Sequence, residues 1–229
     1  MKNVVILTGA GISAESGLKT FRDSNGLWED HRVEDVASPE GWLRDPQLVL
    51  HFYNQRRRHL LQANPNKAHI ALAALEKKYH VAIITQNVDD LHERAGSSSV
   101  LHLHGELLKV RSTKNEQDVM EWRKDLNLGD TCAAGSQLRP HIVWFGEPVP
   151  LIDKAAATVR EADVFIVIGT SLQVYPAAGL IHYCKYECPK YLIDPAAKSI
   201  RGIPNLTVME QAATVAVPEL VNQLLTERT

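Results

Sequence analysis

Cysteine is scarce in this sequence. Only Cys132, Cys184 and Cys188 occur among its 229 residues, so a framework of disulfide bonds is not expected. Long hydrophobic runs are missing as well: no segment approaches the roughly 20 apolar residues that span a bilayer. The apolar run at residues 4–7 is too short for the core of a signal peptide. We therefore expect a reduced, cytoplasmic protein without a membrane partner.

An excess of charge of either sign is also absent. The chain has 25 lysine and arginine residues against 27 aspartate and glutamate residues, a formal net charge of -2. It has no charge block, low-complexity tract or internal repeat, so nothing indicates a nucleic-acid partner. A hydrophobic share of 45% and a charged share of 23% are typical of a globular protein of one or two domains.

Short apolar runs and amphipathic segments alternate along the chain. Runs without polar alternation predict parallel strands buried on both faces, at residues 4–7, 81–84, 142–145, 164–168 and 191–193. Helical patterns occur at residues 45–63, 67–79, 88–95, 151–161, 177–184 and 214–227. This alternation predicts an α/β fold with a Rossmann-like, doubly wound parallel sheet.

Two segments fit the sheet pattern poorly. Residues 26–62 form a long helical detour, and residues 108–139 are polar and irregular. We interpret them as insertions that build a smaller module, with the substrate cleft between this module and the sheet. The expected organisation is a single domain, residues 1–229, with a large subdomain at about 1–25, 64–107 and 140–229 and a small one at about 26–63 and 108–139.

The loop at residues 9–14 (Gly-Ala-Gly-Ile-Ser-Ala) follows the first strand and opens a helix. Such loops are typical of dinucleotide-binding proteins, because glycines let the backbone approach a pyrophosphate; a tight strand-to-helix turn is the simpler alternative. A dehydrogenase would carry an acidic residue at the end of a second strand about 20 residues further on. Neither Asp23 nor Glu29 ends an apolar strand, which disfavours hydride transfer.

Six motifs follow one another in the order found in one family. They are residues 9–13, 17–22 (Gly-Leu-Lys-Thr-Phe-Arg), 85–92 (Thr-Gln-Asn-Val-Asp-Asp-Leu-His), 104–105 (His-Gly), 144–147 (Trp-Phe-Gly-Glu) and 169–174 (Gly-Thr-Ser-Leu-Gln-Val). In these motifs the chain resembles the sirtuins, over nearly its whole length. The resemblance implies NAD-dependent removal of acyl groups from protein lysines, giving nicotinamide, O-acyl-ADP-ribose and free lysine. A non-catalytic NAD or ADP-ribose binding protein and an ADP-ribosyl transferase are the alternatives.

The resemblance implies that His104 is the catalytic base and that Asn87 assists it. An imidazole with an ordinary pKa of about 6.5 can accept the proton of a ribose hydroxyl at neutral pH. The simpler interpretation is that His104 only packs within residues 102–104. Gln86, Asn87 and Asp89 are the implied nicotinamide and ribose contacts, although Asp89 would also suit the start of a helix.

The other implied NAD contacts lie in the loops that follow the strands. They are Gly9, Ala10, Gly11, Ser13, Glu15, Thr20, Phe21, Arg22, Trp28, Val88, Gly169, Thr170, Ser171, Asp194 and Ala212. Asp194 stands where the family usually has asparagine, and its charge would repel a 2′-phosphate, which favours NAD over NADP. Ala212 lies where the family's chain passes the adenine, although the usual glycine is absent.

Tyr53 and Arg56 are three residues apart, which places both on one face of the expected helix. The pair resembles the Tyr-x-x-Arg motif of sirtuins that remove succinyl and malonyl groups, and a guanidinium can bind a carboxylate with two hydrogen bonds. A solvated basic face at residues 56–58 is the alternative, and acetyl removal stays open. Peptide binding as an added strand completes the implied substrate contacts, which are Tyr53, Arg56, Val143, Phe145, Gly146, Glu147 and Val174.

One feature of the family is missing. Most sirtuins carry two Cys-x-x-Cys pairs after the catalytic histidine, whereas residues 107–140 hold only Cys132 and no histidine. Tetrahedral structural zinc needs four such ligands, so we predict that zinc is absent and that the chain has no metal site. We expect the small module to be held by packing, through Met120, Trp122, Leu126 and Leu128. The expected protein is a monomer whose partners are acylated lysine side chains of protein substrates.

Overall fold

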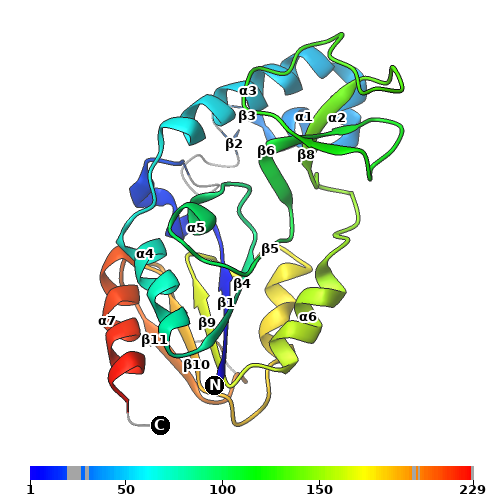
Figure 1. Ribbon diagram of the computed structural model, residues 1–229. Helices are drawn as coiled ribbons and strands as arrows, with labels where there is room; N and C mark the ends of the chain where they lie inside the picture. Colours follow the sequence, from blue (N-terminus) through cyan, green and yellow to red (C-terminus); the bar gives the residue numbers. More distant parts are fainter. Residues whose placement is uncertain (20–26, 29–30, 198–199, 201, 228–229) are drawn as a thin grey trace.

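The computed structural model describes residues 1–19, 27–28, 31–197, 200 and 202–227, and of residues 27–28 the backbone only. Its largest unit is a parallel sheet built from β1 (Asn3–Thr8), β4 (His80–Thr85), β5 (Val100–His102), β9 (Val164–Ile168), β10 (Lys190–Ile193) and β11 (Leu206–Met209). The strand order is β11-β10-β9-β1-β4-β5 (Figure 1). β1 lies between β4 on one side and β9 on the other. Because the connections that follow these strands diverge, a crevice opens beyond the carboxyl end of β1.

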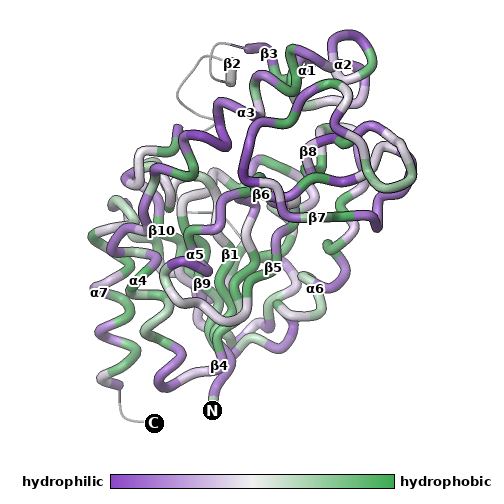
Figure 2. Tube along the Cα trace, turned by 45° about the horizontal axis from the view of Figure 1, so that its top comes forward, coloured by the Kyte–Doolittle hydropathy of each residue, from purple (hydrophilic) through white to green (hydrophobic). Residues whose placement is uncertain are grey.

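Helices cover both faces of this sheet. They are α4 (Lys67–Ala74) with the 3-10 helix η3 (Leu75–Lys77), and α7 (Ala213–Thr226), on one face, and α6 (Ile152–Arg160) with the 3-10 helix η4 (Ala177–Tyr183) on the other. Successive side chains of a strand point to opposite faces. Val4 and Ile6 therefore enter the core under α4 and α7, while Val5 and Leu7 enter the core under α6 and η4. Figure 2 shows these strands as the hydrophobic interior. The predicted α/β class and doubly wound sheet are confirmed.

Four of the five predicted strands belong to the parallel sheet, and the fifth, at residues 142–145, is wrong. Ile142 instead ends β8 (Leu138–Ile142), which pairs antiparallel with β6 (Gly105–Ser112). An apolar run cannot by itself distinguish a buried parallel strand from the end of a small antiparallel one. The pattern also fails to predict the edge strands β5 and β11, because most of their side chains are only partly buried.

The remaining helical predictions differ mainly at their ends. The pattern at residues 88–95 corresponds to the short helix α5 (Leu91–Arg94), and η4 is a 3-10 helix rather than an α-helix. Two single-turn 3-10 helices, η1 (Ala10–Ile12) and η2 (Ala14–Ser16), follow β1. No described helix is long and apolar enough to cross a membrane.

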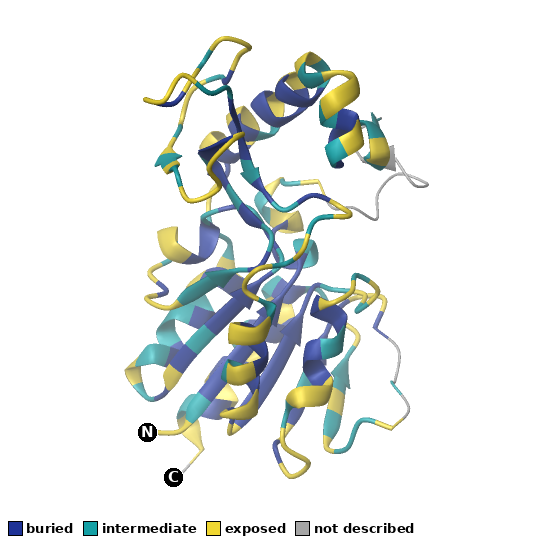
Figure 3. Ribbon diagram, turned by 90° about the vertical axis from the view of Figure 1, so that its right-hand side faces the viewer, coloured by how far each residue is buried: buried dark blue, intermediate teal, exposed yellow. Residues whose placement is uncertain are grey.

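A second unit lies beyond the carboxyl ends of the sheet (Figures 1 and 3). It contains α1 (Val33–Val36), α2 (Pro39–Arg44), α3 (Pro46–Gln62), the antiparallel sheet β7-β6-β8 with β7 (Val119–Glu121), and the short pair β2 (Leu27–Trp28) and β3 (His31–Arg32). The longest helix, α3, packs on β6 and β8. The subdomain limits given above remain a prediction.

The core of this unit differs in one residue from the predicted one. Leu126 is fully buried together with Cys132 and Leu138, and Met120 and Trp122 pack partly buried against them. Leu128 was expected to share this core, but 53% of it is exposed, so that prediction is wrong. The chain turns after Leu126 through residues 127–130, where Asn127 N–H binds the Asp130 carboxylate, and this turn carries Leu128 out into solvent.

Candidate active site

A pocket with a volume of about 790 Å³ lies where the two units meet. Its floor is formed by the loops that follow β1, β4, β9 and β10, and its roof by α3, residues 104–107 and residues 142–149. The volume is in the range of pockets that hold cofactors and drug-sized ligands. The order of the strands places these loops at one edge of the sheet, so residues far apart in the sequence face the same cavity.

The two glycine loops on the floor interlock. Gly11 N–H donates to the carbonyl of Gly169 at 2.8 Å. A Cβ atom on Gly11 would lie 2.6 Å from Gly169 Cα, and one on Gly169, whose φ is +64°, would lie 2.3 Å from the backbone nitrogen of Ile12. Glycine is therefore required at both positions. The result is a side-chain-free surface on which a pyrophosphate can lie against the backbone.

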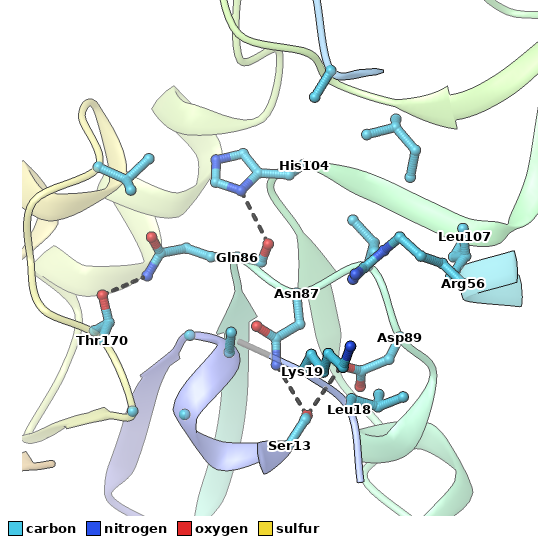
Figure 4. A pocket seen from close by; sticks show the side chains of 18 of the residues that line it. Ser13, Leu18, Lys19, Arg56, Gln86, Asn87, Asp89, His104, Leu107 and Thr170 are labelled. Carbon is cyan, nitrogen blue, oxygen red and sulfur yellow. Dashed lines mark hydrogen bonds between the residues drawn. The ribbon is translucent and has the colours of Figure 1, made fainter. Parts of the chain in front are cut away.

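Polar side chains meet beside this surface (Figure 4). Ser13 Oγ donates to Asp89 Oδ2 at 3.0 Å and accepts from Asn87 Nδ2 at 3.2 Å. Burial raises the pKa of Asp89, while hydrogen bonds from Leu91 N–H and Ser13 partly offset that rise. These three buried side chains form a cluster of donors and acceptors suited to an amide or a sugar hydroxyl.

A second layer of buried histidines lies behind this cluster. His69 Nε2 is 3.4 Å from Ser13 Oγ, His92 Nε2 is 3.1 Å from Thr8 Oγ1, and the two imidazole rings are 4.9 Å apart. Burial lowers the pKa of His69 to about 4 and that of His92 well below its ordinary value. Both rings are therefore neutral and serve as hydrogen-bonding supports for Ser13 and β1.

His104 contacts the backbone of the loop after β4. Its Nδ1 lies 3.0 Å from the carbonyl oxygen of Gln86, and the side chain of Gln86 donates to Thr170 Oγ1 at 3.3 Å (Figure 4). A carbonyl only accepts, so Nδ1 carries the proton and Nε2 of the neutral ring holds a free lone pair. Burial lowers the pKa of His104, and the bond to Gln86 offsets part of that effect. His104 is thus a neutral base at neutral pH.

His102, two residues earlier, is in the opposite state. Its Nδ1 lies 3.2 Å from the carbonyl oxygen of Asn87 and its Nε2 lies 2.7 Å from Glu93 Oε1. Both partners are acceptors, so both ring nitrogens must be protonated. Burial by itself lowers the pKa of His102, but the hydrogen bond and charge of Glu93 outweigh it and raise that pKa. His102 is therefore a cation that anchors the backbone of Asn87.

Tyr53 and Arg56 reach the pocket from α3. The helix starts at a defined point, because the Asp45 carboxylate accepts from Leu48 N–H at 2.9 Å and Pro46 occupies its first turn. Tyr53 is fully buried, and its hydroxyl accepts from Trp144 Nε1 at 3.0 Å. Arg56 is half-buried and enters the cavity from the side opposite Thr170 (Figure 4).

The roof contains the segment expected to meet a peptide. Val143, Phe145, Gly146, Glu147 and, across the opening, Val174 all line the pocket, and Phe145 is 48% exposed. The Glu147 carboxylate is engaged inside the protein, where it accepts from Arg139, Arg111 and the backbone N–H of Trp144.

Most of the expected site residues lie around this one cavity. The expected cofactor contacts in its lining are Gly9, Ala10, Gly11, Ser13, Gln86, Asn87, Val88, Asp89, Gly169, Thr170, Ser171 and Asp194. Glu15 and Ala212 are not part of the lining: Glu15 is exposed and accepts from the Thr214 hydroxyl, and Ala212 precedes α7. Thr20, Phe21, Arg22 and the side chain of Trp28 lie outside the described residues.

Several lining residues were not expected. Trp144, Lys19, His59, Gln62 and Tyr175 border the cavity. Trp144 and Lys19 belong to the motifs at residues 144–147 and 17–22. Their position next to expected contacts could therefore have predicted that they line the cavity. His59 and Gln62 share α3 with Tyr53 and Arg56, and helical spacing places them one or two turns further along the same element.

Fold and site together define a class of protein: a doubly wound α/β protein with a dinucleotide-type glycine loop at the crevice of its sheet and a histidine base beside it. A model of the Sir2 family matches residues 9–176. The chain belongs to the Sir2 family.

Relatives and solved structures agree with this assignment. The chain is 60% identical over 225 residues to a Helicobacter pylori protein named NAD-dependent protein deacylase, with 98% of each chain covered. A solved Sir2 homolog–NAD complex matches with a TM-score of 0.88 and 42% identity, over 98% of this chain and 90% of that one. A structure of Sir2 bound to acetylated peptide matches with a TM-score of 0.79 and 30% identity, over 98% and 94%.

Proposed function

We propose that this protein is an NAD-dependent protein lysine deacylase that removes acetyl and acidic acyl groups such as succinyl and malonyl. The main support for this proposal is that the interlocked glycine loops, the neutral base His104 and the Tyr53–Arg56 pair all line one cavity. The names of the relative in Helicobacter pylori and of the two solved Sir2 complexes support the proposal.

The floor of the cavity fits NAD. The close approach of Gly11 and Gly169 leaves backbone without side chains for the pyrophosphate. Asp194 follows β10, is 2% exposed and lines the pocket, where its carboxylate would accept from ribose hydroxyls. The same negative charge would repel a 2′-phosphate, so we expect NAD and not NADP.

When bound, NAD supplies the nicotinamide ribose, at which the acyl oxygen of the substrate displaces nicotinamide. His104 Nε2 then takes the proton of a ribose hydroxyl, while Nδ1–H stays bound to Gln86 carbonyl and holds the ring in the required tautomer. Ser13 holds Asn87 and Asp89 in place by hydrogen bonds. The three side chains thereby orient the nicotinamide amide and the ribose attached to it. The acyl group passes from the lysine nitrogen to the ribose with the uptake of one water, so the products are nicotinamide, O-acyl-ADP-ribose and free lysine.

The acyl-lysine enters between α3 and residues 142–147. Arg56 binds a terminal carboxylate and the Tyr53 hydroxyl donates a further hydrogen bond. An acetyl group fits the same channel without using either side chain, so both substrates are accepted. The peptide backbone lies between residues 145–147 and Val174, and we propose that the partner is a protein substrate in the cytoplasm.

A matched pair of peptides, one acetylated and one succinylated, tests the proposal with NAD and mass spectrometry. Wild-type protein should free lysine from both. Arg56→Met should lower kcat/KM for the succinyl peptide by at least about 30-fold, the loss typical of a desolvated charge pair, with a much smaller effect on the acetyl peptide. Arg58→Met is the control, because Arg58 lies exposed on the same helix and pairs with Asp125.

The same assay separates the alternative functions. A protein that binds NAD or ADP-ribose without catalysis would release no nicotinamide. An ADP-ribosyl transferase would attach ADP-ribose to protein and leave the acyl-lysine intact. Equal losses on both peptides in Arg56→Met would remove the acid-binding role from Arg56 and leave the deacylase proposal in place.

A further inference from the structure

The Tyr53 hydroxyl has a defined hydrogen-bonding role. Trp144 Nε1 lies 3.0 Å from its oxygen. An indole N–H can only donate, so the Tyr53 oxygen accepts and the hydrogen of the hydroxyl is left for another partner. Burial raises the pKa of Tyr53 far above its ordinary value, so the hydroxyl keeps this hydrogen at neutral pH. The position of the Trp144 indole therefore decides which way the hydrogen of Tyr53 can point.

Trp144 is itself held on two sides. The guanidinium carbon of Arg139 lies 3.3 Å from the centroid of its ring, a close cation–π stack. On another side the Trp42 ring lies 5.8 Å away, centroid to centroid. The backbone N–H of Trp144 donates to Glu147 Oε2 at 2.8 Å. With 2% of the residue exposed, the indole plane has no freedom to turn.

Glu147 completes this support. It accepts from Arg139 Nη1 at 2.7 Å and Nη2 at 3.2 Å, and from Arg111 Nη2 at 3.3 Å. Burial would raise the pKa of Glu147, but these contacts lower it, so the carboxylate is ionised. Two arginines against one carboxylate leave one positive charge behind the indole. Arg56 lines the cavity itself, and the charges of both Arg56 and Arg139 act on the Tyr53 hydroxyl, so this part of the cavity attracts anions.

Apolar side chains could fill the space around Trp144 without the free energy needed to remove charged groups from water. Arg111 and Arg139 are 6% and 9% exposed, and buried ion networks are often no more stabilising than hydrophobic side chains of similar volume. What the network does provide is orientation, because a bidentate guanidinium stacked on an indole fixes the ring plane. The ring plane fixed in this way is that of Trp144, whose N–H binds the Tyr53 hydroxyl.

We propose that Trp144 is a positioning residue that makes the cavity selective for acyl groups ending in a carboxylate. Its N–H occupies one side of the Tyr53 oxygen and turns the hydroxyl hydrogen toward the space beside Arg56, where a carboxylate accepts from both. An acetyl group has no acceptor there and gains nothing from this arrangement. The inference rests on the proposed function and extends its acid recognition to a residue 91 positions from Tyr53.

The first test is Trp144→Phe, which keeps an aromatic ring and removes the N–H. We expect kcat/KM for the succinyl peptide to fall about three- to tenfold, the effect of one neutral hydrogen bond, mainly through KM. The acetyl reaction should fall much less. Trp122→Phe is the matched control, because it also removes one indole N–H, which Trp122 donates to the carbonyl of Asp125, and Trp122 does not line the cavity; it should leave the ratio of the two reactions as in the wild type.

A double variant separates positioning from packing. If Trp144 acts through the hydroxyl, Trp144→Phe should have no further effect on the succinyl reaction in a Tyr53→Phe background. Additive losses, or equal losses on both peptides, would overturn the inference. Arg139→Lys provides a second route if Trp144→Phe does not fold, because lysine keeps the charge but cannot stack or bind Glu147 with two bonds. Unchanged succinyl preference in a folded Arg139→Lys protein would also overturn it.

Calorimetric measurement of peptide binding in the absence of NAD tests this inference independently of the proposed function. If the wild type turns over neither peptide, the deacylase proposal fails, and selective weakening of succinyl-peptide binding by Trp144→Phe would still support the role of Trp144. If the wild type turns over the acetyl peptide but neither binds nor cleaves the succinyl peptide, the inference falls and the deacetylase activity stands.

Discussion

At the scale of single residues, the site works by giving neighbouring groups different protonation states. His102 and His104 are separated by Leu103 alone, and each uses Nδ1 to hold a carbonyl of the loop after β4. Only His102 also meets a carboxylate, that of Glu93. One histidine is therefore a fixed cation that anchors Asn87, and the other is a base ready to accept a proton. Composition cannot distinguish them, because the difference comes from their partners.

The state of His104 predicts a pH dependence. Because the pKa of His104 is lowered from the ordinary 6.5, mainly by burial, the base becomes half-protonated only at a pH below 6.5. We expect kcat/KM of the acetyl reaction at saturating NAD to be level at neutral pH and to fall with unit slope only below 6.5. A midpoint of the acidic limb above 6.5, measured between pH 5 and 8, would contradict this assignment. His104→Ala should abolish the reaction, so that no acidic limb of the pH profile can be measured.

At the scale of elements, α3 carries Tyr53 and Arg56, the pair proposed to set acyl selectivity, and its position depends on contacts with the small unit. Asn54 Nδ2 donates to the carbonyl of Leu126 and Asn54 Oδ1 accepts from Leu126 N–H, both at 2.9 Å. Arg57 adds bonds to Asn54 Oδ1 at 2.7 Å and to the carbonyl of Leu107 at 3.2 Å. These buried polar contacts set the rotation of the helix, and with it the direction of Tyr53 and Arg56.

Asn54→Ala is expected to loosen this attachment. The change leaves the backbone N–H and carbonyl of Leu126 buried without partners, at a cost of about 3 kcal/mol in the free energy of unfolding. Because α3 is no longer held in register, the succinyl reaction should weaken more than the acetyl reaction. Urea denaturation and the paired peptide assay measure both effects. Gln55→Ala, at the next and exposed position, is the control, and equal stability of the two variants would refute this role for Asn54.

At the scale of the whole molecule, two units with different kinds of core enclose one cavity. The parallel sheet is held by two large apolar cores, one on each face. The small unit combines a modest apolar core around Leu126 and Leu138 with the buried hydrogen bonds of α3. Within the described part of the chain, no group of three or more His, Cys, Asp or Glu side chains could hold a metal ion. Cys132 lies buried, with its sulfur 3.5 Å from Ser112 Oγ.

This arrangement predicts that the small unit needs no metal. We expect purified protein to contain substoichiometric zinc, and we expect EDTA to leave both its melting temperature and its deacylase activity unchanged. A protein stabilised by a structural zinc would instead unfold or lose activity with the chelator. One bound zinc per chain in a metal analysis would contradict the prediction. Light scattering on the same sample tests the expected monomer.

The sequence by itself determined four of the six strands of the parallel sheet, the main helices, the glycine loops and the spacing of Tyr53 and Arg56. These features depend on local periodicity and on residue types that permit close backbone approach, and both can be read along the chain. The sequence pattern misplaced residues 142–145, because an apolar run does not specify its pairing partner. It also assigned Leu128 to a core that it does not enter.

Only the tertiary structure decided the remaining properties of the site. It brought Trp144 against Tyr53, turned the carboxylate of Glu147 toward Arg139, and shifted the pKa values of His102 and His104 in opposite directions. Each of these depends on burial and on partners distant in sequence, since the pKa of a group and the direction of a hydroxyl are set by what surrounds them in space.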